Sequence, residues 1–349
     1  MTPSPAQYRF GLRLLLGLAP LAAAVIITGV LLLIVGAPPI DTYLKLIEGS
    51  FGSNTKIADT LVVWVSLALC SAGLLLTFTA GQWNIGVEGQ ITLGAIFATG
   101  AARVLWDQPG LVALPLIVAW GAVGGALWAI LVGLLKTYGK VHEIFGGLGF
   151  NFISTALTIY LIFGPWQQKT GGTLSGTQIF PDALWLPTLP GLRVSVYSAI
   201  VALIVVVIIY LSLRGTVWGL QLKAVGKSLR GAYVLGIPTD RRLLSAYALC
   251  GACAGIAGAF LTVGVHHRLI PGISSGYGFL SILIVLLSGF RALWVLPIAL
   301  FFAAVGIGST ALQLDLRLDS SLGGVLQAAI VLAFIFMQGV REKYIRAEG

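Results

Sequence analysis

Long apolar segments separated by short polar loops constrain this chain more than any other feature. Segments of membrane-spanning length lie at 12–36, 58–80, 83–103, 111–135, 143–163, 194–213, 244–265, 276–290, 293–312 and 322–340. A helix of about 20 apolar residues can cross a bilayer because it satisfies its own backbone polar groups. The chain is 58% hydrophobic and only 9% charged, whereas a soluble domain carries about 25% charged residues. The sequence therefore predicts one all-α polytopic membrane domain over residues 1–349, with about ten transmembrane helices.

The predicted spans differ in strength. The first apolar run, which follows Arg9 and Arg13, is longer than the roughly 7–15 apolar residues of a signal peptide, so we expect a retained helix. The span 83–103 is the weakest because it begins with polar residues, and it could be broken or re-entrant. The span 276–290 is short.

Basic residues in the loops indicate how the chain lies across the membrane. With both termini in the cytoplasm, fourteen of the 21 Lys and Arg residues fall on the inner side. This bias follows the positive-inside rule, and an even number of spans requires both termini to lie on the same side. We therefore expect N-in and C-in, a cytoplasmic loop at 214–242 and an extracytoplasmic loop at 164–194. The net charge of +9 then reflects orientation, and we expect no nucleic acid partner.

The cysteines and paired histidines do not predict a metal site. Cys250 and Cys253 form a C-x-x-C pattern, but they lie among small apolar residues and are interpreted as core residues. His266 and His267 are adjacent rather than spaced for a shared metal, and no acidic residue lies close to them in the sequence. We interpret them as surface residues of an outer loop.

A polar stretch, GQWNIGVEGQ at residues 81–90, interrupts the apolar pattern. It places Glu88 at or near membrane depth, where a carboxylate costs roughly 3 kcal/mol and normally faces a bundle interior or a water-filled path. Its glycines weaken a helix and allow close approach of backbones. The stretch therefore indicates part of a translocation pathway.

The inner loop at 214–242 is amphipathic and basic. Its spacing predicts a helix from about Leu220 to Leu235 with an apolar and a basic face. Such a helix could lie on anionic lipid or dock a cytoplasmic partner, and the residues alone do not decide between the two. The GKS at 226–228 ends like a phosphate-binding loop, but that motif requires glycine where Gln221 stands. We therefore expect no nucleotide on this chain, so that any ATP hydrolysis belongs to another subunit.

Two segments carry a family resemblance. NIGVEGQITLGA and GLQLKAVGKSLRGAYVLGIPTDRRLLSAYALCGACAGIAGAFLTVG resemble the permeases of ABC importers for ribose-type sugars, branched-chain amino acids and nucleosides. Lys223 replaces the arginine usual in that family, Ser228 replaces asparagine and Cys250 replaces serine. HEIFGGLGFNFISTALTIYLIFGPW is similar to the longer permease of nucleoside importers fed by BMP-type lipoproteins. The resemblance covers about residues 60–340.

The resemblance implies a set of partners. A second permease would complete the pore, in a heterodimer with a shorter homologue. A cytoplasmic ABC ATPase would hold ATP and Mg, with no cofactor and no catalysis on this chain, and an extracytoplasmic lipoprotein would deliver the substrate. The inner loop would be the coupling segment that contacts the ATPase. Its expected contact residues are Lys223, Ala224, Val225, Gly226, Lys227 and Gly236.

Polar and aromatic residues at membrane depth are candidates for the substrate pathway. Asn84, Glu88 and Asn151 match polar positions of the family; they could bind ribose hydroxyls or a base edge, or they could instead join helices to one another. Glu88 could also be a helix-end carboxylate at the cytoplasmic surface. Aromatic side chains could stack on a base or serve as packing. The remaining candidates are Trp83, Gln90, Phe150 and Phe279.

These observations predict the permease subunit of an ATP-driven ABC importer for nucleosides in the cytoplasmic membrane. Ribose or another small polar solute is the alternative within this class. A secondary transporter driven by an ion gradient is the alternative from another class, but it would need more ionisable residues deep in the helices than Glu88 and Glu143. The amphipathic inner loop and the polar stretch argue against a purely structural or receptor protein.

Overall fold

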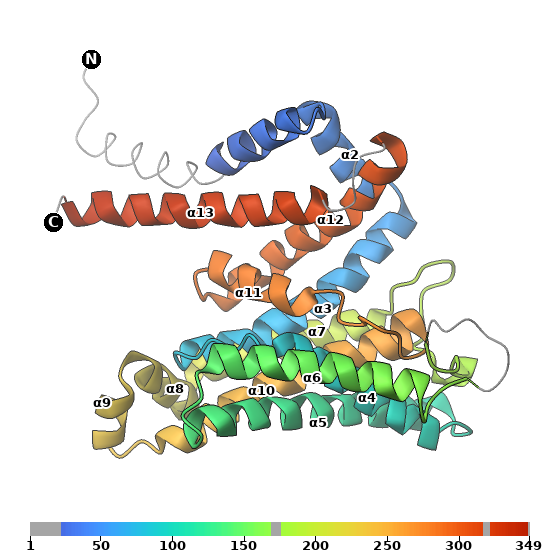
Figure 1. Ribbon diagram of the computed structural model, residues 1–349, viewed down its shortest axis with the longest axis horizontal. Coiled ribbons are helices and arrows are strands. Elements are labelled where there is room, and N and C mark those ends of the chain that lie inside the picture. Colours follow the sequence, from blue (N-terminus) through green and yellow to red (C-terminus); the bar gives the residue numbers. More distant parts are fainter. Residues whose placement is uncertain (1–21, 169–175, 317–321, 348–349) are drawn as a thin grey trace. The chain divides into compact units, whose positions relative to one another are not determined.

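The computed structural model describes residues 22–168, 176–316 and 322–347, and it contains helices and no strands over these residues (Figure 1). The predicted all-α class is confirmed. The chain divides into two compact units, which are described separately: unit 1 comprises Met1–Ile57 and Ala304–Gly349, and unit 2 comprises Ala58–Ala303. The helices α3 (Asn54–Thr79) and α12 (Ala292–Leu316) contribute residues to both units.

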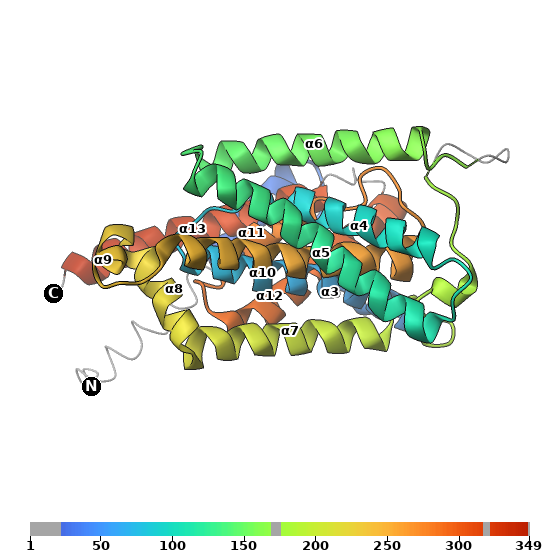
Figure 2. The ribbon, with the colours of Figure 1, turned by 90° about the horizontal axis from the view of Figure 1, so that it is seen from below.

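Unit 2 contains the polar stretch and the inner loop. Its long helices, besides parts of α3 and α12, are α4 (Val87–Val104), α5 (Gly110–Thr137), α6 (Glu143–Phe163), α7 (Val196–Gly215) and α10 (Thr239–Phe260), which continues as the π-helix η2 (Leu261–His266). Its shorter helices are η1 (Asp182–Leu184), α8 (Val217–Lys227), α9 (Leu229–Val234) and α11 (Tyr277–Leu287). Figure 2 shows α6 along one edge of this unit and α7 along the opposite edge, with α5 and α10 between them.

Glycines allow α4, α5 and α10 to pack closely together. A Cβ atom at Gly94 in α4 would lie 2.3 Å from the Cα of Gly255 in α10, and a Cβ atom at Gly251 would lie 2.2 Å from the carbonyl oxygen of Gly125 in α5. No residue with a side chain fits at either crossing. Small residues at helix crossings are typical of membrane bundles, where close backbone approach supplies van der Waals contact. These three helices therefore form a close-packed core, and the polar stretch leads directly into one of them, α4.

Unit 1 contains a sharply bent helix pair. Ala22–Ile34 and α2 (Pro39–Phe51) meet at 108°, next to Gly36, which has a φ of +81°. The Ser50 hydroxyl donates to the carbonyl oxygen of Ala304 at 2.5 Å. The helix α13 (Leu322–Ala347) closes the unit. Arg9, Arg13 and the start of the first predicted span lie outside the described residues.

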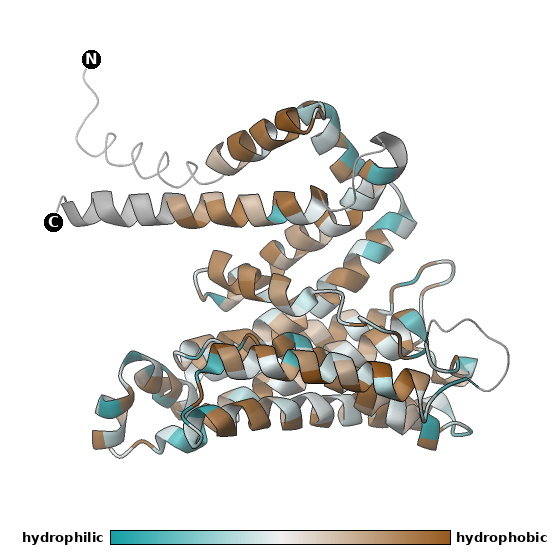
Figure 3. Ribbon diagram, in the orientation of Figure 1, coloured by the Kyte–Doolittle hydropathy of each residue, from teal (hydrophilic) through white to brown (hydrophobic). Residues whose placement is uncertain are grey.

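Six described helices are long and apolar enough to cross a membrane, or seven if the bent pair counts as one span. Every one of the ten predicted segments contains helix within the described residues. However, α4 is too polar to pass the same test, α11 has only 11 residues, and the apolar part of α13 is short. The number of about ten spans and the N-in, C-in orientation therefore stay predictions. Figure 3 shows hydrophobic residues along the helices of unit 2 and hydrophilic residues at the loops that join them.

Candidate functional site

The polar stretch forms a turn between α3 and α4. Helix α3 ends at Thr79, and α4 begins at Val87, four residues later than the predicted start of this span. Gly81 has a φ of +74° and its N–H donates to the Phe78 carbonyl oxygen, while the Gln82 N–H donates to that of Thr77. A glycine in the left-handed region commonly ends a helix in this way. The predicted interruption at this point is therefore a tight turn that leads directly into α4.

Asn84 and Gln90 bind each other inside this turn. The Asn84 Nδ2 donates to Gln90 Oε1 at 3.1 Å, and the Gln90 Nε2 donates to Asn84 Oδ1 at 3.0 Å. Both side chains are completely buried. Asn84 Nδ2 also lies 3.1 Å from the Cys250 sulfur on α10. The pair therefore holds the turn against α4 and α10, and any contact of these amides with a substrate stays a prediction.

Asn151 connects α6 to the same turn. Its Oδ1 accepts from the Gly89 N–H at 2.8 Å, and its Nδ2 donates to the Ile85 carbonyl oxygen at 3.0 Å. Gly89 lies in the first turn of α4, whose N–H groups have no partner within the helix. The residue that precedes α4 is Gly86, which has no side chain to cap the helix. Asn151 thus supplies the cap from a different helix, and the close approach requires glycine because a Cβ at Gly89 would lie 2.9 Å from Asn151 Oδ1.

Glu88 joins the turn to α11. Its Oε1 accepts from the Gly276 N–H at 2.9 Å and its Oε2 accepts from the Gly278 N–H at 2.8 Å. The carboxylate lies in the first turn of α4 and at the N-terminus of α11, so the positive ends of two helix dipoles favour its charge. Glu88 is partly buried. It is therefore a helix-end carboxylate, as one interpretation expected, but it contacts α11 rather than standing free at a surface.

The aromatic candidates pack in separate places. The Trp83 ring meets Phe78 edge-on at 5.1 Å, and Phe78 lies 5.8 Å from Phe290. Phe150 meets Trp128 edge-on at 4.8 Å. Trp83 and Phe279 remain 42% and 43% exposed, so both have free ring surface. Over the described residues, no ring contact joins Trp83, Phe150 and Phe279 to one another.

The inner loop forms two helices, and the prediction of one helix from Leu220 to Leu235 is wrong. Ser228 separates α8 from α9 with an extended backbone (φ −159°), and its hydroxyl accepts from the Gly231 N–H at 3.0 Å. Serine at this position caps the new helix and competes with continuation of the first. Gly236, with a φ of +77°, follows the end of α9.

The expected coupling residues divide between a buried and an exposed side of this segment. Val225 is buried against residues of α3 and α10, and Ala224 packs beside it. Gly226 lies against the end of α3, where a Cβ would be 2.0 Å from the Thr79 carbonyl oxygen, and a Cβ at Gly81 would lie 3.2 Å from the Gly226 carbonyl oxygen. Lys223, Lys227 and Gly236 are exposed. The segment therefore touches the polar turn on one side and is open on the other.

Residues 180–186, which include η1, form a cap over η2. The Leu186 N–H donates to the Val263 carbonyl oxygen, and His267 stacks on Trp185 at 4.0 Å. Both histidines are partly exposed and partly covered by neighbouring residues, so their interpretation as surface residues is confirmed only in part. Burial lowers the pKa of His267, an effect that its contact with the Val263 carbonyl oxygen and the charge of Asp182 partly offset. Residues 169–175 of the predicted outer loop lie outside the described residues.

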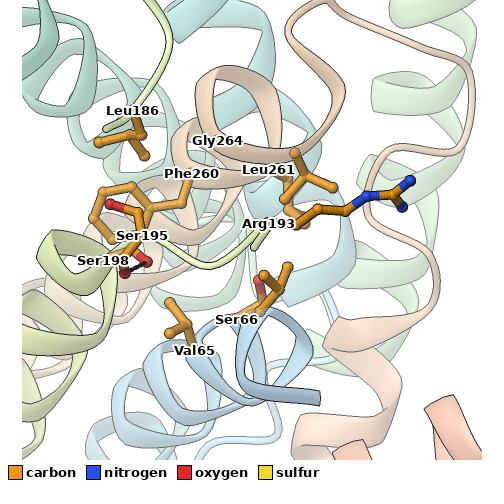
Figure 4. A pocket seen from close by; sticks show the side chains of 11 residues that line it. Val65, Ser66, Leu186, Arg193, Ser195, Ser198, Phe260, Leu261 and Gly264 are labelled. Atoms are coloured by element: carbon orange, nitrogen blue, oxygen red, sulfur yellow. Dashed lines mark hydrogen bonds between the residues drawn. The ribbon is translucent and has the colours of Figure 1, made fainter. Parts of the chain in front are cut away.

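A small cavity lies beneath this cap (Figure 4). Its volume of about 10 Å³ suits one water molecule. Ser195 lines it and is 3% exposed, and its hydroxyl has no hydrogen-bond partner among the described residues. The Arg193 guanidinium points away from Ser195 and Ser198. The cavity is too small for a sugar or a nucleoside, and it is a packing feature of the cap.

Sequence reasoning missed several residues that hold the turn. Cys250 contacts Asn84, although the sequence marked it only as a core residue of a C-x-x-C pattern and as an exception to the family pattern. Gly276 and Gly278 bind Glu88 through backbone N–H groups, so no complementary charge marked them. The SSGYG pattern at 274–278 was a usable signal, because glycines that open a helix commonly expose N–H groups to an anion.

Comparisons with known proteins match this chain to membrane permeases. Residues 56–335 match the family described as the permease component of the branched-chain amino acid transport system. A glucose ABC transporter permease of Haloferax volcanii is 31% identical over 95% of this chain and 88% of its own length. A guanosine permease of Bacillus subtilis is 27% identical over 90% and 92%, and a nucleoside permease of Lactococcus lactis is 26% identical over 90% and 89%.

Second permeases with the same described substrates also match. A further guanosine permease of Bacillus subtilis is 22% identical, and a further nucleoside permease of Lactococcus lactis is 24% identical. The matched region contains α4, α6, α8, α10 and α11, and therefore the contacts of the polar turn described above. Together with its apolar helices, the match shows that this chain is a multi-pass plasma-membrane protein and belongs to the branched-chain amino acid transport family of ABC transporter permeases.

Proposed function

We propose that this chain is the permease subunit of an ATP-driven importer that moves nucleosides across the membrane by alternating access. One contact carries the proposal: Gly226 of α8 lies against Thr79 and Gly81 at the polar turn. Movement of α8 must therefore reach the turn directly, since no side chain lies between them to absorb it. The polar turn also contacts α6 through Asn151 and α11 through Glu88.

The geometry supports a mechanism in which a cytoplasmic ATPase acts on α8 and α9. Exposed apolar residues on this segment, Leu220, Tyr233 and Val234, are 68%, 72% and 77% exposed, next to the exposed cations Lys223 and Lys227. Such a surface suits a protein partner with an apolar pocket and acidic rim. ATP and Mg would be bound by that partner, and closure of the partner would shift the equilibrium between outward- and inward-facing states.

A nucleoside is the proposed substrate because two of the relatives above are described as guanosine and nucleoside permeases. The exposed faces of Trp83 and Phe279 can each stack on a base, which contributes roughly 1–3 kcal/mol. Asn84, Glu88, Gln90, Phe150 and Asn151 complete the proposed pathway, either by contact or by holding its walls. A sugar is the second candidate, since the glucose permease is 31% identical.

The proposed assembly contains a second permease, because Bacillus subtilis and Lactococcus lactis each have two matching permeases for the same described substrate. A heterodimer with a shorter homologue, an ABC ATPase and a substrate-binding lipoprotein complete it. We further propose about ten spans with both termini in the cytoplasm, the cytoplasmic loop at 214–242 and the extracytoplasmic loop at 164–194.

Uptake of radiolabelled guanosine, uridine, ribose and glucose tests the proposal. Cells would express this chain with the neighbouring ATPase, second permease and lipoprotein genes, and a matched strain would carry a Walker lysine substitution in the ATPase. We expect nucleoside uptake that the substitution abolishes. Sugar uptake without nucleoside uptake would replace the substrate, and uptake that survives the substitution would favour a transporter driven by an ion gradient.

A further inference from the structure

A basic pocket lies where α7, α8 and the turn before α12 meet in unit 2. Its volume is about 380 Å³, within the usual range for ligand pockets. Three cations line it, Arg214 from α7, Lys223 from α8 and Arg291 from the α11–α12 turn, and no acidic residue does. None of the three forms an ion pair within the described part of the chain.

The pocket combines positive charge with exposed apolar surface. Its lining includes the first turn of α12, whose N-terminus is the positive end of a helix dipole. Phe290, Leu293 and Trp294 also line it and are 51%, 66% and 55% exposed. The Arg214 guanidinium donates to the Tyr210 hydroxyl, which holds this cation at the pocket wall. An occupant must therefore supply both an anion and apolar groups.

The pocket lies where two candidate membrane spans end, and therefore at one surface of the membrane. Arg214 lies in the last turn of one candidate span, Val196–Gly215, and Ala292 begins another, Ala292–Gln313. Tryptophan and long cationic side chains are enriched at this level of the bilayer, where hydrocarbon meets headgroups. A soluble anion would satisfy the charge but leave Leu293 and Trp294 uncovered.

We propose that this pocket binds the phosphate headgroup of an anionic phospholipid, with an acyl chain along Phe290, Leu293 and Trp294. Basic pockets between transmembrane helices bind such headgroups. Lys223 also lies on α8, which contacts the polar turn through Gly226. A lipid held here therefore links the composition of the membrane to the segment proposed to receive the ATPase, and its binding does not depend on which substrate is transported.

Native mass spectrometry of the purified full-length chain in neutral detergent tests the site. Phosphatidylglycerol and phosphatidylcholine with identical acyl chains would be titrated separately, with inorganic phosphate as a competitor. We expect phosphatidylglycerol to bind preferentially. Arg291→Gln should weaken it about fivefold, because each cation near an anionic lipid contributes about 1 kcal/mol, and Arg214→Gln with Arg291→Gln should weaken it about 25-fold if the two effects add. Arg291→Lys should retain most of the binding.

Lys140→Gln is the matched control, since Lys140 is exposed, does not line the pocket and loses the same charge. Equal binding of the two lipids, or equal losses in Lys140→Gln and Arg291→Gln, would overturn the proposal. Displacement of phosphatidylglycerol by millimolar inorganic phosphate would overturn the lipid in favour of a free-anion site. Loss of the lipid when the ATPase assembles, with a new crosslink from Arg291→Cys to the ATPase, would assign the pocket to a protein partner.

Discussion

The polar turn at residues 81–90 and the α8–α9 segment use their polar side chains differently. In the turn, Asn84 and Gln90 are buried and bind each other, and the buried amide of Asn151 on α6 binds backbone groups of the turn. On α8 and α9, the cations Lys223 and Lys227 and the apolar side chains Leu220, Tyr233 and Val234 are exposed. A buried polar group costs free energy unless it is paired, so the turn can change only as a unit, whereas the exposed segment is free to bind.

The largest expected effect comes from the point where these two regions touch. Gly226→Ala places a Cβ 2.0 Å from the Thr79 carbonyl oxygen, so α8 must move away from α3. Overpacking of this kind costs about 1–3 kcal/mol or more. We expect a lower unfolding temperature in detergent and a loss of transport. Gly215→Ala is the control, because nothing lies within 4 Å of the added atom.

This result would separate packing from coupling. Gly226→Asp is a less suitable test of uncoupling between transport and ATP hydrolysis. Its Cβ would collide with the Thr79 carbonyl oxygen as the alanine Cβ does, so a loss of transport would not distinguish uncoupling from disturbed packing. If Gly226→Ala and Gly215→Ala unfold at the same temperature, the contact between α8 and the polar turn is not rigid, and the proposed route of coupling fails.

Glu88→Gln should have the next largest effect. The carboxylate accepts from two N–H groups, whereas a glutamine presents one oxygen and one NH₂ group and leaves one N–H facing another donor. Hydrogen bonds to charged groups contribute about 1.5–3 kcal/mol, so we expect a loss of about 2 kcal/mol. Thermal unfolding and uptake would be measured together.

The control for Glu88→Gln is Glu48→Gln, whose carboxylate forms an exposed pair with Lys45 and should leave the unfolding temperature unchanged. Transport that falls far more than stability would indicate that Glu88 serves the pathway as well as the fold. Matched losses would leave it a purely structural residue, and no loss of stability would contradict the contact with α11.

A smaller effect should follow pH at the cap over η2. Burial lowers the pKa of His267, so the folded protein binds this proton less well than the unfolded chain, in which histidine titrates near 6.5. The stabilisation is present above that value and declines as the pH falls below it. Unfolding temperatures between pH 8 and pH 5 would measure it.

His267→Phe keeps a ring against Trp185 and removes the titration. The difference between wild type and this variant should therefore change with pH, with the wild type losing stability faster on acidification. Parallel curves for the two proteins would show that other groups, such as His266, account for any pH dependence.

The smallest effect on stability should come from the exposed segment. Val234→Ser with Leu235→Ser changes side chains that are 77% and 78% exposed, and substitutions at such surfaces usually change stability by less than about 0.5 kcal/mol. We nevertheless expect weaker association with the ATPase, measured by copurification. Unchanged association and transport would show that α9 is not part of the docking surface.

The sequence predicted the positions of the long helices better than the breaks and contacts between helices. Apolar length placed α6 at residues 143–163 as observed, because a buried or lipid-facing helix depends mainly on composition. It did not place the break at Ser228, because a serine within an amphipathic pattern can continue a helix or cap the next one. It identified Asn151 as a residue in need of a partner, but could not supply Ile85 and Gly89, whose backbone groups are the same in every residue type.

Glu88 illustrates a wider consequence of such backbone contacts. Its two partners are backbone N–H groups of Gly276 and Gly278, which every residue type except proline carries. A compensating second mutation therefore cannot arise in the usual way, by exchanging charges between positions, and pairs of covarying residues would not reveal this contact. The contact does depend on the space at Gly278, since a Cβ there would lie 2.6 Å from Glu88 Oε2. In the evolution of this protein, the contact should appear as a glycine that never changes rather than as two residues that change together.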